Sequence, residues 1–240
     1  MKKYLAIFDF DYTVVDDNTD TFYWSYLPED IKNNFLDKFN EGKLTWHQLL
    51  NVLMPLLPWD ELIKIVTKIK MTSGILELFD YLIKSDSIIC IVSDSNTEFI
   101  KQILKQQNIE KFVKEIHTNG IELPTEQQPT VKVVTYEKAF DFYQIRKCDQ
   151  TCDINHMCKG TVVEKLIEKY PDCVPFFAGD GGNDYCAMKR IEKLSENGLN
   201  FVRRGFRLEA KINKLPEKDR EFVSLFWESG LQIKQFLENQ

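Results

Sequence analysis

Short apolar runs, each closed by polar residues, constrain the fold of this chain more than any other feature. The clearest runs cover 4–8, 88–92 and 173–178, and a weaker one covers 199–202. Their length and their β-branched and aromatic residues indicate buried strands. Between them, apolar residues recur at the spacing of amphipathic helices. Strands that alternate with helices predict an α/β fold with a mostly parallel sheet.

Polar and acidic residues follow these strands at the edge where open α/β sheets bind ligands. Asp9-Phe10-Asp11-Tyr12-Thr13 follows the first run, and Ser93 follows the second. Lys159 opens a helical pattern, and the run before Gly179 leads into Gly179-Asp180-Gly181-Gly182-Asn183-Asp184. Ordinary turns also use Asp, Ser, Asn and Gly, but the order of all four pieces favours one shared site.

Two stretches interrupt the alternation. Residues 15–72 have a helical pattern broken by prolines, and we expect them to form a helical cap inserted after the first strand. The catalytic core is then formed by residues 1–14 and 73–240. A second excursion covers about 119–157 and contains a strand candidate at 131–134.

Composition narrows the class of protein. The chain has 240 residues and a net charge of -6, and no basic stretch suits a nucleic-acid backbone. No apolar run approaches the ~20 residues of a membrane span, and the N-terminal apolar stretch is too short for a signal peptide. We therefore expect a cytoplasmic protein with reduced cysteines. The sequence indicates no oligomeric state.

The residues at the strand ends suit phosphoryl transfer, which needs a nucleophile, a proton donor and positive charge around the phosphate. Asp9 and Asp180 offer the oxygen ligands that Mg²⁺ prefers. Asp11 can serve as general acid and then as base for water. The Ser93 hydroxyl and the Lys159 ammonium group can bind phosphate oxygens.

This order of motifs resembles the haloacid dehalogenase superfamily of phosphatases, whose motifs are DxDx[TV], a Ser or Thr, a Lys, and GDxxxD. It is most similar to the group of phosphoethanolamine/phosphocholine phosphatases and pyridoxal-phosphate phosphatases. The resemblance rests on residues 8–13, 15–20, 92–96, 148–159 and 179–184. It implies a Rossmann-like core with a C1-type helical cap, and a phosphomonoesterase activity on a small substrate.

The resemblance also implies roles for individual residues. Asp9 becomes the nucleophile and Asp11 the proton donor. Mg²⁺ is expected at Asp9, the main-chain carbonyl of Asp11, and Asp180, with Thr13 and Asp184 supporting the site.

Substrate contacts are implied at Asp20, Asp94 and Asn183. The aromatic residues of 22–26 follow a cluster of Asp residues, a pattern suited to an ammonium group. No Arg occurs between Val14 and Asp86, which disfavours substrates that carry a carboxylate. Asp20 could instead be a helix N-cap, and the aromatic residues could belong to the hydrophobic core of the cap. Pyridoxal phosphate remains a candidate substrate because aromatic side chains would also stack on its ring.

Three other interpretations remain. A phospho-receiver signalling domain and a phosphotransferase would use the same aspartyl-phosphate chemistry. Cys148, Cys152, His156 and Cys158 could hold zinc, but they lack a CxxC pair, so packing is the favoured interpretation.

Arg203, Arg204 and Arg207 form too short a basic patch to indicate a nucleic-acid partner. Tyr12 departs from the resembled pattern, and its bulk could narrow the entrance.

Overall fold

The core of the molecule is a seven-stranded sheet with the order β4-β3-β2-β1-β5-β6-β7. The computed structural model describes residues 2–128, 130–136 and 157–240. The strands are β1 (Tyr4–Phe8), β2 (Ile88–Asn96), β3 (Val113–Glu122), β4 (Lys132–Val134), β5 (Val174–Gly179), β6 (Leu199–Arg203) and β7 (Leu225–Trp227). All neighbouring pairs are parallel except β3 and β4. The predicted α/β class and mostly parallel sheet are confirmed.

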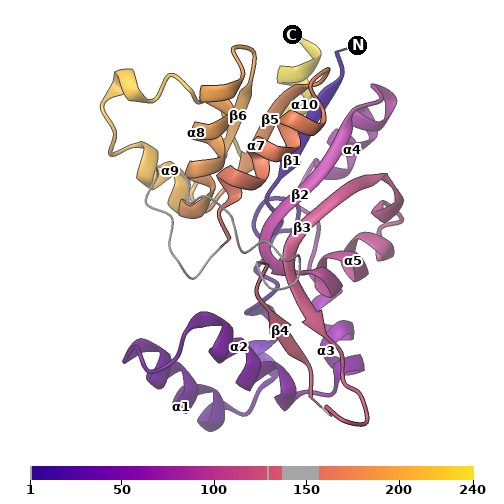
Figure 1. Ribbon diagram of the computed structural model, residues 1–240, viewed down its shortest axis with the longest axis vertical. Helices are drawn as coiled ribbons and strands as arrows, with labels where there is room; N and C mark the ends of the chain where they lie inside the picture. The colour runs from indigo at the N-terminus through magenta and orange to yellow at the C-terminus, as the bar shows by residue number, and fades with distance from the viewer. Residues whose placement is uncertain (1, 129, 137–156) are drawn as a thin grey trace.

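Helices cover both faces of the sheet (Figure 1). In β1, Tyr4, Ala6 and Phe8 face one hydrophobic core, whereas Leu5 and Ile7 face the other. The first core is covered by α4 (Ile75–Lys84), α5 (Thr97–Gln106) and α10 (Gly230–Glu238). The second is covered by α7 (Lys159–Lys169), α8 (Tyr185–Leu194) and α9 (Arg207–Ile212). Burial on both faces explains why the central strands are continuously apolar.

A helical insertion, residues 22–66, lies beyond the edge of the sheet where the strands end (Figure 1). It comprises η1 (Phe22–Tyr26), α1 (Glu29–Asn40), α2 (Trp46–Leu53), η2 (Met54–Leu56) and α3 (Trp59–Val66). The chain enters and leaves it through paired segments: Val15 and Met71 form an antiparallel bridge, and the Asp16 N–H donates to the Lys70 carbonyl at 2.8 Å.

The hairpin of β3 and β4 reaches this insertion (Figure 1). The Asn51 side chain on α2 donates to the Val133 carbonyl at 3.2 Å and accepts from the Val133 N–H at 2.6 Å. The strand candidate at 131–134 is thus confirmed as β4, and it connects the sheet to the insertion.

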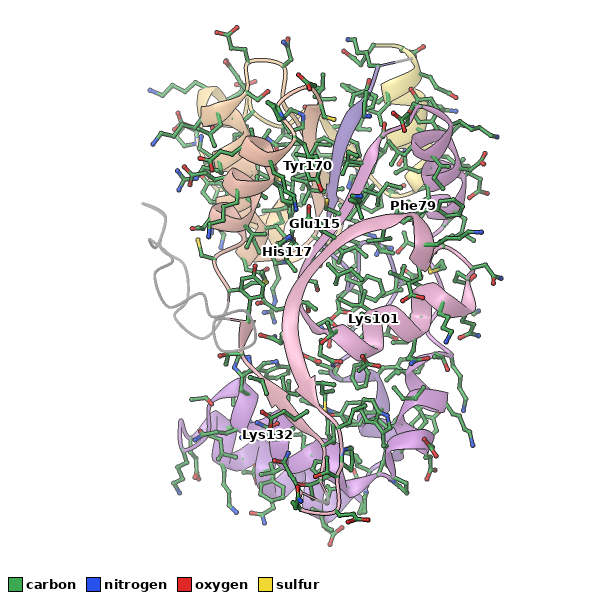
Figure 2. All side chains as sticks on the ribbon, turned by 45° about the vertical axis from the view of Figure 1, so that its right-hand side comes forward. Phe79, Lys101, Glu115, His117, Lys132 and Tyr170 are labelled. Carbon is green, nitrogen blue, oxygen red and sulfur yellow. The ribbon has the colours of Figure 1, made fainter. Side chains whose placement is uncertain are left out.

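At the other end of β3, hydrogen bonds hold α7 against the sheet. Glu115 and His117 on β3 lie beside Tyr170, which follows α7 (Figure 2). Tyr170 donates to Glu115 at 2.5 Å, and the other Glu115 oxygen lies 3.2 Å from His117 Nε2. These contacts fix the helix that begins at Lys159.

Several details differ from the sequence predictions. β2 continues through the polar residues 93–96, and β3 and β7 were not predicted as strands. Short 3-10 helices occur at η3 (Glu110–Phe112), η4 (Gly182–Asp184) and η5 (Glu217–Asp219). None of the helices in the described ranges combines the length and the hydropathy of a membrane span.

Candidate active site

Asp9 lies immediately after β1, at the junction with β5. Its backbone N–H donates to the Ala178 carbonyl at 2.9 Å, so the pairing of β1 with β5 continues one residue past the strand. The Asp9 side chain is nearly buried, and Oδ1 accepts from the Phe10 N–H at 2.7 Å. The sheet therefore fixes this carboxylate at the centre of its carboxyl edge.

Lys159 lies between two carboxylates. Its Nζ is 2.9 Å from Asp9 Oδ2 and 2.6 Å from Asp184 Oδ1, and the residue is fully buried. Burial lowers the pKa of Lys159, but the charges of Asp184 and Asp9 outweigh it and hold this pKa well above its ordinary value. The first residue of α7 thus presents a fixed positive charge beside Asp9.

The turn after β5 is organised by Asp184. Its Oδ2 accepts from the backbone N–H groups of Asp180 and Gly181 at 2.9 and 2.8 Å. A Cβ at Gly179 would lie 2.4 Å from the same oxygen, so only glycine fits there. Thr13 in turn donates to Asp180 Oδ1 at 3.1 Å. Thr13 and Asp184, which the resemblance implies as supporting residues, both hydrogen-bond to Asp180 and so orient it.

Asp9, Asp180 and Asp184 form a buried acidic triad. Carboxylate oxygens of the three residues lie within 4.8 Å of one another. Burial and the neighbouring Asp9 charge raise the pKa of both Asp180 and Asp184. The donors are carboxylate oxygens, which suit a hard cation such as Mg²⁺, and a cation would relieve their mutual repulsion. Asp9 and Asp180 are carboxylates that the sequence predicts as ligands and they fit Mg²⁺, whereas both Asp184 oxygens already contact Lys159 or backbone N–H groups.

Asp11 has a different environment from Asp9. Its carboxylate accepts from the Thr19 N–H at 3.0 Å and from the Thr19 hydroxyl at 3.2 Å. The Thr19 hydroxyl also lies 2.6 Å from the Ser95 hydroxyl. Burial, followed by the charges of Asp20 and Asp9, raises the pKa of Asp11 well above its ordinary value. A raised pKa favours the protonated form of a carboxyl group, which is the form that can act as a proton donor.

Asp20 lies where the helical insertion begins. It is almost fully buried, and Trp46 at the start of α2 donates its indole N–H to Asp20 Oδ2 at 3.3 Å. Burial raises the pKa of Asp20 to about 7, assisted by the Asp94 charge and opposed by the Trp46 hydrogen bond. The alternative role of Asp20 as an N-cap is wrong, because η1 begins at Phe22 with Thr21 at the N-cap.

Asp94 and Asn183 are brought together by the structure. Asn183 Nδ2 donates to Asp94 Oδ2 at 2.5 Å, and the Met157 N–H donates to Asp94 Oδ1 at 3.1 Å. Asn119 Nδ2 holds the Asp94 main-chain carbonyl at 2.6 Å. Asp94 therefore joins β2, β3 and the segment leading into α7. Ser93, just before it, is buried at the end of the apolar part of β2.

The sequence does not predict the residues that orient these side chains. Thr19 and Ser95 lie inside motifs that were recognised, but nothing in the spacing shows their contacts. Trp46 is 26 positions from Asp20, so its approach depends on how the insertion packs. Cys148, Cys152 and His156 lie outside the described residues. Among those that are described, the acidic triad is the one group of three or more potential metal ligands.

A solved structure of a phosphoserine phosphatase with bound substrate has the same fold. It aligns with a TM-score of 0.62 at 20% identity and covers 98% of this chain and 99% of its own. The two chains share this fold, and in this chain the carboxyl edge of the sheet carries the acidic triad. A family model described as Putative Phosphatase matches residues 4–240, and the chain belongs to that family.

Curated relatives agree with this assignment. A mouse pyridoxal phosphate phosphatase, PHOSPHO2, is 29% identical over 98% of both chains. A chicken phosphoethanolamine/phosphocholine phosphatase is 22% identical and aligns over 98% of this chain and 88% of its own. The chain is a phosphoric monoester hydrolase, and the family resemblance read from its motifs is confirmed.

Proposed function

We propose that the protein is a Mg²⁺-dependent phosphomonoesterase that works through an aspartyl-phosphate on Asp9. The observation that carries the proposal is the buried Lys159, which lies 2.9 Å from Asp9 and 2.6 Å from Asp184. A fixed positive charge beside a buried carboxylate favours the approach of a phosphate anion to that carboxylate. The acidic triad provides a second place for positive charge.

In the proposed mechanism, an Asp9 carboxylate oxygen attacks phosphorus and the bond to the leaving oxygen breaks. Asp11 gives its proton to that oxygen, then accepts a proton from the water that hydrolyses the aspartyl-phosphate. Lys159 and Ser93 bind the phosphate oxygens throughout. Mg²⁺, held by Asp9, the Asp11 main-chain carbonyl and Asp180, with Thr13 and Asp184 supporting, would reduce the repulsion between the two anions.

The proposed division of the chain assigns residues 1–14 and 73–240 to a catalytic core and 15–72 to a cap. Support comes from the position of the helical insertion beyond the carboxyl edge of the sheet (Figure 1). Further support is that it contributes Trp46, which contacts Asp20. The proposed catalytic residues all belong to the core, so the proposed role of the cap is to select the substrate.

The proposed substrate is a small phosphomonoester that bears an amine, with Asp20, Asp94 and Asn183 as its contacts. The Trp46 ring lies 5.8 Å from that of Trp24, so aromatic surface lies beside the Asp20 carboxylate. A cation binds well at a carboxylate flanked by aromatic rings. The names of the relatives suggest phosphoethanolamine, phosphocholine and pyridoxal phosphate as first candidates.

The alternatives differ from this proposal in the fate of the phosphate. A phospho-receiver domain keeps its aspartyl-phosphate, whereas the raised pKa of Asp11 favours a protonated acid that promotes turnover. A phosphotransferase would pass the phosphate to an alcohol. Product analysis with added acceptor alcohols distinguishes it from a hydrolase.

A phosphate-release panel tests the proposed activity and substrate together. With Mg²⁺ present, we expect phosphoethanolamine, phosphocholine and pyridoxal phosphate to have a higher kcat/KM than phosphoserine and sugar phosphates. EDTA should abolish release, and added Mg²⁺ should restore it. Full activity in EDTA would contradict the metal dependence, and a preference for sugar phosphates would contradict the substrate.

A further inference from the structure

Arg203, at the end of β6, is a buried cation that lies outside the proposed chemistry. Only 8% of the Arg203 surface is exposed. The guanidinium group donates through Nη1 to the Tyr12 main-chain carbonyl and to the Thr72 hydroxyl, the latter at 3.4 Å. Nη2 donates to Asp16 Oδ1 at 2.5 Å. One side chain therefore contacts the loop after β1 and both segments that connect the core to the helical insertion.

These contacts meet at a strained turn. Tyr12 has a φ of 53°, in the left-handed region that a bulky residue rarely adopts. Its ring lies 5.3 Å from that of Phe206, and the Arg203 guanidinium lies 4.8 Å from the centre of the same Phe206 ring. Such a backbone conformation persists only where surrounding contacts fix it. Arg203 supplies the contact to the Tyr12 carbonyl.

We propose that Arg203 is a positioning residue that holds the loop 9–13 so that Asp11 points at the leaving oxygen. The inference rests on the proposed function, since it assigns Arg203 to the same reaction. Asp11 directly precedes Tyr12, so a turn that relaxes at Tyr12 changes the direction of the Asp11 side chain. Asp9 is held separately, by β5 and Lys159.

This difference gives a readout that a general loss of structure does not produce. An alkyl phosphate such as phosphoethanolamine needs a proton at its leaving oxygen, whereas p-nitrophenyl phosphate releases a stable anion and needs it far less. A misdirected acid therefore lowers kcat/KM for the alkyl ester selectively. Damage to the nucleophile or to the fold lowers both values alike.

The test compares Arg203→Met with Arg204→Met, a control at the next residue, where the side chain is 50% exposed and pairs with Glu209. In Arg203→Met we expect the ratio of alkyl to aryl kcat/KM to fall by about tenfold, because a misplaced general acid loses much of its contribution to the rate. Arg204→Met should keep the wild-type ratio. An unchanged ratio in Arg203→Met, or equal losses on both esters, would overturn the proposal.

A second variant keeps the test decisive if Arg203→Met does not fold. The Asp16 side chain is 57% exposed, so Asp16→Asn preserves the fold while it weakens the ion pair that orients Arg203. It should lower the same ratio in the same direction, by roughly two- to threefold. If Asp16→Asn keeps the wild-type ratio, the inference about Arg203 is overturned. If the unmodified enzyme is inactive on both esters, the proposed function is overturned as well.

Discussion

Asp9, Asp11 and Asp20 are the same side chain in three different environments. Asp9 contacts the ammonium group of Lys159, Asp11 accepts from Thr19, and Asp20 accepts from an indole N–H. The pKa is raised well above its usual range for Asp11 and to about 7 for Asp20. Enzymes separate nucleophile from acid in this way, by differences in environment between chemically equal groups.

At the residue scale, Trp46 should determine how well Asp20 binds a cationic substrate. Trp46→Phe keeps an aromatic ring beside Trp24 but removes the hydrogen bond to Asp20. The hydrogen bond lowers the pKa of Asp20 and so favours its charged form. Such a bond contributes about 0.5–1.5 kcal/mol, so KM for phosphoethanolamine should rise by roughly two- to tenfold. Steady-state kinetics should show kcat nearly unchanged.

The matched control is Trp59→Phe, which removes an indole from the same insertion where the ring stacks on Phe99. It should leave KM for phosphoethanolamine close to that of the wild type. Neither variant should change KM for p-nitrophenyl phosphate, which carries no amine. Equal increases in KM on both substrates would show that Trp46 acts on phosphate binding rather than through Asp20.

At the scale of elements, the sequence predicts five of the seven strands but not β3 or β7. β1 and β5 are buried on both faces, so their apolar runs are visible in the sequence. β3 reads Val-Lys-Glu-Ile-His-Thr-Asn-Gly-Ile-Glu and is largely half-buried, so apolar and polar residues mix along it. Its identity as a strand depends on β2 beside it, which local patterns cannot show.

The site also has a part that the sequence predicts and a part that it does not. Residues at the ends of strands are predictable because a parallel sheet collects them at one edge. Trp46, Asn119 and Arg203 reach that edge from elements far away in the chain. Arg203 in particular looked like part of a short basic patch, although it is buried.

The link between α2 and β4 makes an element-scale prediction. Asn51→Ala removes both hydrogen bonds to Val133, and we expect a loss of about 1–3 kcal/mol in the free energy of unfolding. Hydrogen exchange should increase at 132–134 in particular. Asn34→Ala, at an exposed position on α1, is the control and should change neither quantity. Unchanged exchange in Asn51→Ala would contradict the link.

At the scale of the whole molecule, the acidity of the chain is concentrated in one region. The stretch from Tyr4 to Ile31 contains seven acidic residues and no Lys or Arg, against a net charge of -6 for the whole chain. The structure buries Asp9 and Asp20 from this stretch but leaves Asp16 exposed. Part of the acidity therefore belongs to the interior of the site, where ionised groups repel one another.

Stability should consequently depend on pH and on Mg²⁺. Burial raises the pKa of Asp180 and Asp184 in the folded protein. A carboxyl with a raised folded-state pKa loses its stabilising contribution as pH rises above its unfolded value of about 4 and through the folded value. Without added metal, the melting temperature should therefore fall as these groups ionise.

Mg²⁺ should oppose that fall, because it binds the ionised, folded site and not the unfolded chain. The increase in melting temperature on adding Mg²⁺ should be larger at about pH 8 than at about pH 5. Asp180→Asn should reduce the increase at both values. An increase independent of pH, or one that is undiminished in Asp180→Asn, would contradict a magnesium site at the acidic triad.

The central claim is that Asp9 carries the phosphate during turnover, and trapping the phosphoenzyme tests it most directly. Acid quenching during turnover of p-nitrophenyl phosphate, followed by peptide mass spectrometry, should find one phosphate on the peptide that contains Asp9. Asp9→Asn should carry none, whereas Asp11→Asn should accumulate it because hydrolysis of the intermediate needs the base. A phosphate on another residue, or turnover by Asp9→Asn at the wild-type rate, would contradict the account.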